Sequence, residues 1–203
     1  MTRTTLIACA LLVALVGGGC KKRVKTDPTA VNMESFNLGL AVGLLQANKV
    51  KSGKDFEKAV NARNISRVDV DHDGRPDPIQ VVESRKGDRR ELALRAIPTS
   101  AKGQPADDVA VPVADIKFTP DRDAQALKVE AAYAPVVRGG PPVAFTVPAV
   151  WQGDVVVFQP TSFFYWLLVV DRPIFIGTYW AEVIVIDAPP PHIHYGKFKH
   201  KHK

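Results

Sequence analysis

Cysteine is nearly absent from this chain. The 203 residues include two cysteines, Cys9 and Cys20, and both lie within the first twenty positions. A disulfide framework of the kind that holds small secreted domains together is therefore excluded for the rest of the chain, and so is a cysteine nucleophile. The fold must depend on apolar packing, and a hydrophobic share of 46% over this length is enough for one globular domain.

Histidine is scarce as well. One of the five histidines is His72, and the other four follow residue 191, so the middle of the chain offers no imidazole as a general base. The sequence also lacks the GxSxG, HExxH and phosphate-binding GxxxxGK[ST] motifs. Hydrolysis by a pair of carboxylates stays open, because the distance between two acids cannot be read from sequence. A non-enzymatic protein is favoured; the alternative is a hydrolase, which the later features of the sequence would make a calcium-stabilised envelope hydrolase.

No apolar run reaches the length of about twenty residues that a membrane span needs. The first run, residues 6–16, follows Arg3 and leads through three glycines to Cys20. A positive start, a short apolar stretch and small residues are typical of a secretory signal. Here the small residues directly precede a cysteine, and in this the segment resembles a bacterial lipoprotein signal, although glycine replaces the usual leucine at position 17.

The lipoprotein resemblance implies that residues 1–19 are removed and that Cys20 carries the lipid, including a palmitate-type chain. Lys21 after the cysteine implies sorting to the outer membrane, facing the periplasm or the exterior. Several acyl chains on one residue anchor a protein far better than one chain does. The alternatives are an ordinary secretory signal cut near the glycines and an uncleaved anchor.

The charge balance is basic, with 27 Lys and Arg against 21 Asp and Glu and a net charge of +6. Part of the surplus lies in residues 21–23 and 197–203, which suits contact with anionic lipid or lipopolysaccharide. No basic stripe interleaved with aromatics is present, so no nucleic-acid partner is expected. In the flexible tail, residues 188–203, four closely spaced histidines could hold a transition metal, although a solvated basic tail is the simpler interpretation: His192, His194, His200 and His202.

The remaining chain predicts an α+β fold, in which short N-terminal helices precede a mainly antiparallel β domain of sandwich-like or barrel-like form. Residues 20–31 are expected to be a lipidated tether and residues 32–64 a helical segment. Two helices are predicted there, over residues 32–48 and 54–62, the second started by Ser52. The first is expected to be buried or to lie against the bilayer.

Residues 65–187 are expected to form the β-rich domain. Residues 99–108 are predicted to be a loop, and turns are expected at residues 86–88 and 152–154. Two late apolar runs, residues 163–170 and 174–186, are interpreted as buried strands, with an aromatic patch that enters the membrane as the alternative. The other predicted strands are residues 65–70, 79–83, 91–97, 109–118, 126–133, 143–150 and 155–158.

One acidic stretch stands out against the basic balance. DVDHDGRPD, residues 69–77, has the pattern D-x-D-x-D-G-x-x-D. Alternate carboxylates can converge on one point while a glycine turns the chain around it, and calcium is the cation that such a hard oxygen site suits best. The expected ligands are the side chains of Asp69, Asp71, Asp73 and Asp77 and the carbonyl of Arg75. His72 is expected to point outward.

The acidic stretch resembles the calcium loops of EF-hand, thrombospondin type 3 and FG-GAP proteins. Gln80 stands where an EF-hand has its bidentate glutamate, and Pro76 and Pro78 oppose a helix after the loop. The resemblance therefore implies a structural Ca²⁺ in a loop between strands. The alternative is an acidic turn whose aspartates accept hydrogen bonds from nearby backbone amides.

Overall fold

A computed structural model describes residues 24–137 and 140–178 of the chain. The predicted signal peptide, Cys20, the first part of the predicted tether and the four histidines after residue 191 lie outside these residues. The described elements, in chain order, are η1 Pro28–Ala30, α1 Leu38–Gln46, α2 Gly53–Val60, β1 Ile79–Lys86, β2 Arg89–Ala96, η2 Thr99–Ala101, α3 Ala106–Val109, β3 Val111–Asp121, β4 Ala126–Tyr133, β5 Val143–Pro148, β6 Val150–Gln152, β7 Val155–Val157 and α4 Phe163–Leu168.

Five strands form one antiparallel sheet in the order β1-β2-β3-β4-β5, and β6 pairs with β7 in a small second sheet. Each strand of the large sheet pairs with the next along the chain, so short turns suffice to connect β1 to β2 and β3 to β4. Gly87 turns the first hairpin with φ +64°, a conformation that glycine adopts readily. The mainly antiparallel, α+β character predicted from sequence is confirmed.

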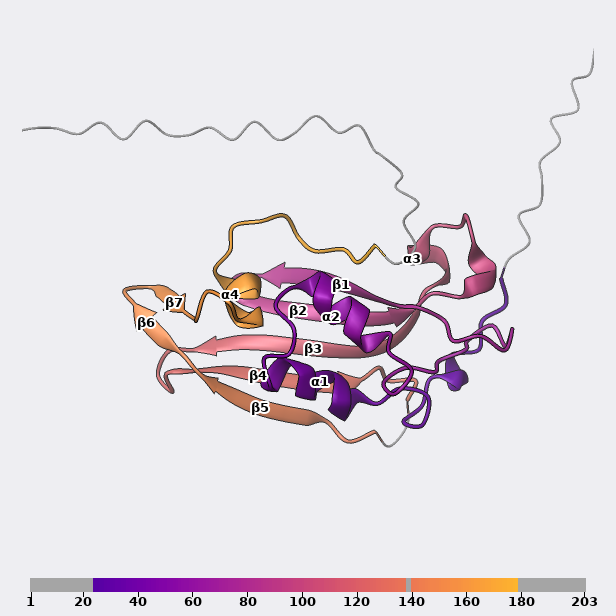
Figure 1. The fold of residues 1–203 in the computed structure, drawn as a ribbon, viewed down its shortest axis with the longest axis horizontal. Helices are drawn as coiled ribbons and strands as arrows, with labels where there is room; N and C mark the ends of the chain where they lie inside the picture. Colours follow the sequence, from indigo (N-terminus) through magenta and orange to yellow (C-terminus); the bar gives the residue numbers. More distant parts are fainter. Residues whose placement is uncertain (1–23, 138–139, 179–203) are drawn as a thin grey trace, which may run out of the picture.

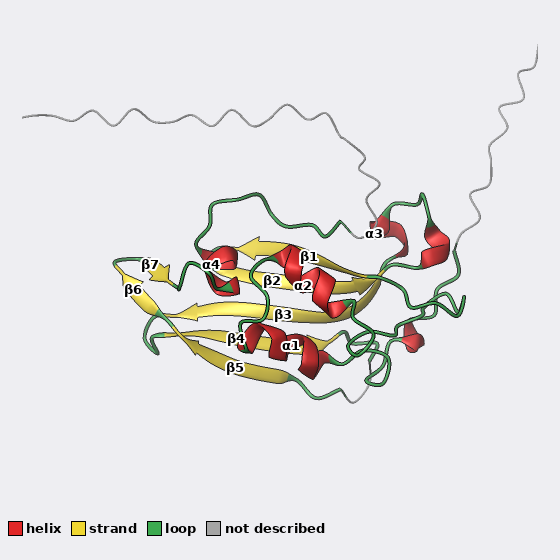
Figure 2. Cartoon of the chain, viewed as in Figure 1, coloured by secondary structure: helices red, strands yellow, loops and turns green. Residues whose placement is uncertain are grey.

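Helices α1, α2 and α4 lie together over one face of the large sheet (Figures 1 and 2). The strands direct alternate side chains toward these helices, and the central ones, including Leu92, Ile116 and Val129, are completely buried. Helices cover this face, and the large sheet ends at β1 and β5 within the described chain, without closing into a barrel. The apolar core therefore lies between one sheet and one helical layer.

Both predicted N-terminal helices are present, in shorter form. Ser52 caps α2 by accepting a hydrogen bond from the Asp55 amide, as its position predicted. In α1, the buried face comprises Leu38, Ala41, Val42 and Leu45, whereas Leu40 is exposed. No helix within the described residues is both long and apolar enough to cross a membrane.

The prediction of a strand at residues 163–170 is wrong, because this segment contains helix α4. Ser162 caps the helix by accepting a hydrogen bond from the Tyr165 amide. Phe163 is fully buried, with its ring centroid 5.8 Å from that of Phe56 and 6.2 Å from that of Phe118. Aromatic residues are frequent in strands, but burial against the sheet decides the conformation here.

Three further predictions need correction. Residues 65–70 make only an isolated bridge, Phe36 to Ser66, in place of a strand. The predicted strand over residues 143–150 is divided between β5, which pairs with β4, and β6, which pairs with β7. The predicted loop at residues 99–108 contains the short helices η2 and α3.

The last described residues, 171–178, lie in extended form along the outer edge of β1. We call this segment the C-terminal clasp. Glu83 N donates to Phe175 O and Gly177 N donates to Val81 O, each at 2.8 Å, around the bridge between Val82 and Ile176. The rest of the predicted strand, residues 179–186, lies outside the described chain.

Side chains of α2 and of the residue that follows it complete the cover of the β1 edge. Asn61 both donates to Ile79 O and accepts from Ile79 N, at 2.8 and 2.7 Å, as a neighbouring strand would. The buried carboxylate of Glu57 accepts from Val81 N at 2.9 Å and from Thr178 N at 3.0 Å. The exposed backbone of an edge strand invites pairing with another chain, and here it is largely satisfied internally.

Candidate metal centre

The acidic loop, residues 69–77, is closed at its base by the residue that ends it. Asp77 N donates to Val68 O at 2.6 Å, and the Asp77 side chain accepts from Val70 N at 2.6 Å. Val68 and Val70 are fully buried and anchor the entry to the loop in the core. The loop therefore begins and ends at one fixed point, directly before β1.

Within the loop the chain curls around the side chain of Asp69. Gly74 has φ +82°, and His72, with φ +56°, also adopts the left-handed region. These conformations allow Asp69 to accept hydrogen bonds from Asp73 N at 3.1 Å and from Gly74 N at 2.9 Å. The predicted turning role of Gly74 agrees with this geometry.

Three of the four predicted aspartates come together. Asp69, Asp71 and Asp77 each offer a carboxylate oxygen, and these three oxygens lie within 4.8 Å of one another. Asp69 and Asp71 are half-buried, and Asp77 is 2% exposed. A carboxylate oxygen that accepts one amide hydrogen bond still has a lone pair for a cation, so the backbone contacts are compatible with metal binding. Hard oxygen donors of this kind suit calcium.

The fourth predicted aspartate is directed elsewhere. Asp73 accepts hydrogen bonds from Thr99 Oγ1 at 2.6 Å and from Arg75 N at 2.8 Å, and its side chain is exposed. It is not one of the three converging carboxylates. The carbonyl of Arg75 as a ligand stays a prediction.

Sequence reasoning missed two residues that hold the loop from outside. Thr99 N donates to Asp77 at 2.7 Å and Ser100 N donates to Asp71 at 2.9 Å, so η2 packs against the acidic loop through its backbone. Backbone amides carry no sequence signal, and the two segments are separated by the β1–β2 hairpin. Their contact could not have been inferred without the fold.

Burial and charge act differently on the three carboxylates. Burial raises the pKa of Asp77 to about 6, and repulsion from Asp71 and Asp69 adds to this against the opposing hydrogen bonds from Thr99 and Val70. For Asp71, partial burial also acts to raise the pKa, but hydrogen bonds from Ser100 and Asp73 outweigh it and lower the pKa. A cation at the centre would favour the charged form of Asp77 and remove the unfavourable effect of its burial.

The exposed side chain of His72 agrees with the expectation that this residue points outward. Its Nε2 nevertheless lies 3.0 Å from Oδ2 of Asp27, the residue directly before η1. The hydrogen bonds from Thr29 and then from His72 lower the pKa of Asp27 to about 2, and the same contact raises the pKa of His72. Asp27 N also donates to Val70 O at 2.7 Å, so the segment before η1 joins the fold at the acidic loop.

Comparison with family models, with curated proteins and with solved structures found no match to this chain. The class of protein is therefore defined by its own geometry. It is an α+β protein with one helix-covered antiparallel sheet and a three-carboxylate loop at the base of β1.

Proposed function

We propose that this chain is a lipid-anchored protein of the bacterial cell envelope, with a structural or interaction role, and that one Ca²⁺ bound in the acidic loop stabilises it. The observation that carries the calcium part is the convergence of Asp69, Asp71 and Asp77 around one point, with Asp77 buried. Three carboxylates so close repel one another, and a divalent cation relieves that repulsion.

The anchor follows from the lipoprotein resemblance of Cys20, and the outer membrane is its expected destination. Asp27, which joins the tether to the acidic loop, lies seven positions after Cys20. An extended tether of this length reaches roughly 25 Å, so the loop would lie close to the membrane surface. Calcium would then stiffen the point at which the tether enters the fold. The basic tail would add contacts with lipid or lipopolysaccharide phosphates.

Calcium titration of the protein by calorimetry, with thermal melting alongside, tests the ion. We expect heat of binding and a higher melting temperature for the wild type, and a loss of both for Asp71→Ala. Asp88→Ala is a matched control, because Asp88 is an exposed carboxylate in the β1–β2 turn. Equal responses of Asp71→Ala and the wild type would refute the ion site.

Membrane partitioning tests the anchor separately. Cys20→Ser is expected to move the protein from the membrane fraction to the soluble fraction, and Cys9→Ser is expected to leave it membrane-bound. If Cys20→Ser remains in the membrane fraction, the lipid anchor is refuted, whatever the calcium titration shows.

A further inference from the structure

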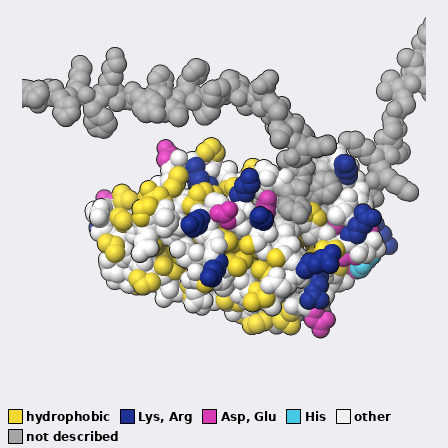
Figure 3. Space-filling view, in the orientation of Figure 1, with side chains coloured by type: hydrophobic (Ala, Val, Ile, Leu, Met, Phe, Trp, Pro, Cys, Tyr) yellow, Lys and Arg dark blue, Asp and Glu magenta, His cyan; other side chains and the backbone are white. Residues whose placement is uncertain are grey.

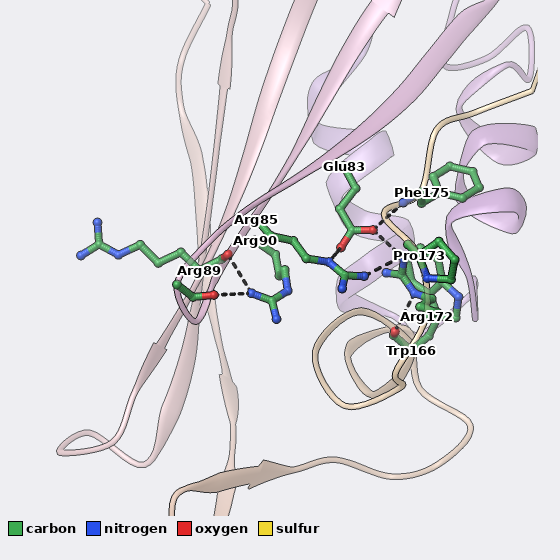
Figure 4. Close-up of polar contacts among 9 residues, drawn as sticks. Glu83, Arg85, Arg89, Arg90, Trp166, Arg172, Pro173 and Phe175 are labelled. Carbon is green, nitrogen blue, oxygen red and sulfur yellow. Dashed lines mark hydrogen bonds and ion pairs between the residues drawn. The ribbon is translucent and has the colours of Figure 1, made fainter. Parts of the chain in front are cut away.

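Three arginines gather around one buried carboxylate at the far end of the β1–β2 hairpin (Figure 4). We call Arg85, Arg90 and Arg172 the arginine cluster. The carboxylate is that of Glu83, whose side chain is fully buried. Three positive charges face one buried negative charge, and the exposed Asp88 in the neighbouring turn offsets the surplus only in part. Charge is costly to bury in such a place.

The Glu83 carboxylate already accepts hydrogen bonds from three donors. It accepts hydrogen bonds from Arg85 Nε at 2.7 Å, from Arg172 Nη1 at 2.5 Å and from the backbone amide of Phe175 at 2.9 Å. Burial acts to raise its pKa, but the bonds from Arg172 and Arg85 outweigh this and lower it. The carboxylate is therefore ionised, and its bonds reach two of the three arginines and not the third.

Arg90 is the arginine without a carboxylate partner. It lies directly opposite Arg85 in the β1–β2 register, on the face of the sheet that the helices cover, and like charges in such a pair repel. Its Nη1 donates to the carbonyls of Gly87 and Arg89, but its Nε is buried without a hydrogen-bond acceptor among the described residues. Burial, and next the charge of Arg85, lower the pKa of Arg90.

Arg172 contributes a second buried donor with no acceptor. Its guanidinium stacks 3.5 Å above the Trp166 ring, and Nε and Nη1 donate to the carbonyls of Trp166 and Pro173. Its Nη2 is buried, and the described chain provides no acceptor for it. A cleft of about 340 Å³ reaches Arg172 from the side of Lys54 and Phe175.

We infer that the arginine cluster binds a phosphate group, either that of inorganic phosphate or that of a lipid headgroup. The surplus of positive charge suits a phosphate, which carries more negative charge than a carboxylate. Guanidinium forks match the geometry of phosphate oxygens, and an oxyanion supplies acceptors of the kind that Arg90 Nε and Arg172 Nη2 lack. The site lies at the opposite end of β1 from the acidic loop and is independent of calcium.

Arg89 provides a matched control. It neighbours Arg90 in the same hairpin and carries the same charge, but its side chain is exposed and points away from the other arginines (Figure 4). Arg90→Gln removes a charge from the cluster, whereas Arg89→Gln removes a charge from the opposite face of the sheet. Thermal melting in phosphate-free buffer checks that each variant folds. If Arg90→Gln does not fold, Arg85→Gln is used in its place.

The experiment is a calorimetric titration of the full-length chain in non-ionic detergent with EDTA present. Inorganic phosphate and a soluble short-chain phosphatidic acid are the two probes, and the matching phosphatidylcholine is the control lipid. We expect binding of at least one phosphate probe by the wild type and by Arg89→Gln, and a loss of at least tenfold in affinity for Arg90→Gln. Preference for phosphatidic acid over inorganic phosphate would identify the lipid as the source.

Three results would overturn the inference. The first is the absence of binding of either phosphate probe to the wild type at millimolar concentration. The second is equal affinity in Arg90→Gln and the wild type. The third is a loss of affinity confined to Arg89→Gln, which would place any anion on the uncovered face of the sheet.

Discussion

Replacing Asp77 with asparagine is expected to change how stability depends on pH. The pKa of Asp77 in the fold is about 6, against an ordinary value of 3.8, so the folded state binds this proton more tightly than the unfolded state does. Without a cation, the stability that this group contributes is complete below about pH 4 and is lost as the pH rises through about 6. A pKa difference of this size corresponds to about 3 kcal/mol.

An asparagine side chain at position 77 does not titrate, and it has one acceptor oxygen where the carboxylate has two. The two oxygens of Asp77 accept from Val70 N and Thr99 N, so the new side-chain amide faces one of these donors. That mismatch costs about 1–3 kcal/mol at every pH. The variant should therefore be less stable than the wild type near pH 4, and the difference should shrink or reverse by about pH 7, because only the wild type then carries a buried charge.

Urea unfolding in EDTA across this pH range measures the difference, with Asp88→Asn as an exposed control. Calcium at about a hundredfold its Kd should add about 2.7 kcal/mol to the wild type and far less to Asp77→Asn. If the free energies of unfolding of the wild type and Asp77→Asn in EDTA change with pH in parallel, the reasoning about the burial of Asp77 is refuted. An equal gain from calcium in both proteins would refute the role of Asp77 as a ligand.

Three further predictions concern the core and the clasp. Gly177→Ala should lower the free energy of unfolding in urea by about 2 kcal/mol or more, because the added Cβ would lie 1.4 Å from Glu57 Oε2. Gly43→Ala is the control: this glycine of α1 has open space around it, and alanine there should stabilise the protein by about 0.5–1 kcal/mol. Phe163→Ala should cost about 3–5 kcal/mol in the same assay, since the ring is fully buried beneath α4, and a loss below 1 kcal/mol would contradict the packing described. Glu83→Gln should cost about 3–5 kcal/mol near neutral pH by leaving Arg172 and Arg85 without their counter-charge. Because the folded-state pKa of Glu83 is lowered, the loss should diminish as the pH falls through that pKa, and a pH-independent loss would contradict the ion pairs.

Local signals in the sequence were sufficient for much of the sheet. The predicted strand over residues 126–133 coincides with β4, and the Lys86-Gly87-Asp88 turn joins β1 and β2 as expected. Alternation with a period of two, bounded by a glycine, is a property of neighbouring residues, so no tertiary information is needed to recognise it.

The errors arise where distant contacts decide the structure. FFYWLL has the composition of a strand, yet it is the helix α4, because Phe163 packs into a space that Phe56 and Phe118 leave between sheet and helices. At the acidic loop, the aspartate pattern predicted four side-chain ligands. It could not predict that Thr99 would draw Asp73 aside, since that contact depends on the path of the chain after β2.

The position of the C-terminal clasp has a consequence for how the chain is made. The clasp is the last described part of the fold to be synthesised, and it supplies Arg172, Phe175 N and Gly177 N to β1. A nascent chain that ends before residue 171 has a buried carboxylate at position 83 with most of its donors missing and an edge strand open to other chains. A chain that contains the clasp therefore differs from a truncated one in how completely the β1 edge is covered, and the truncated chain is the more prone to pair with other chains.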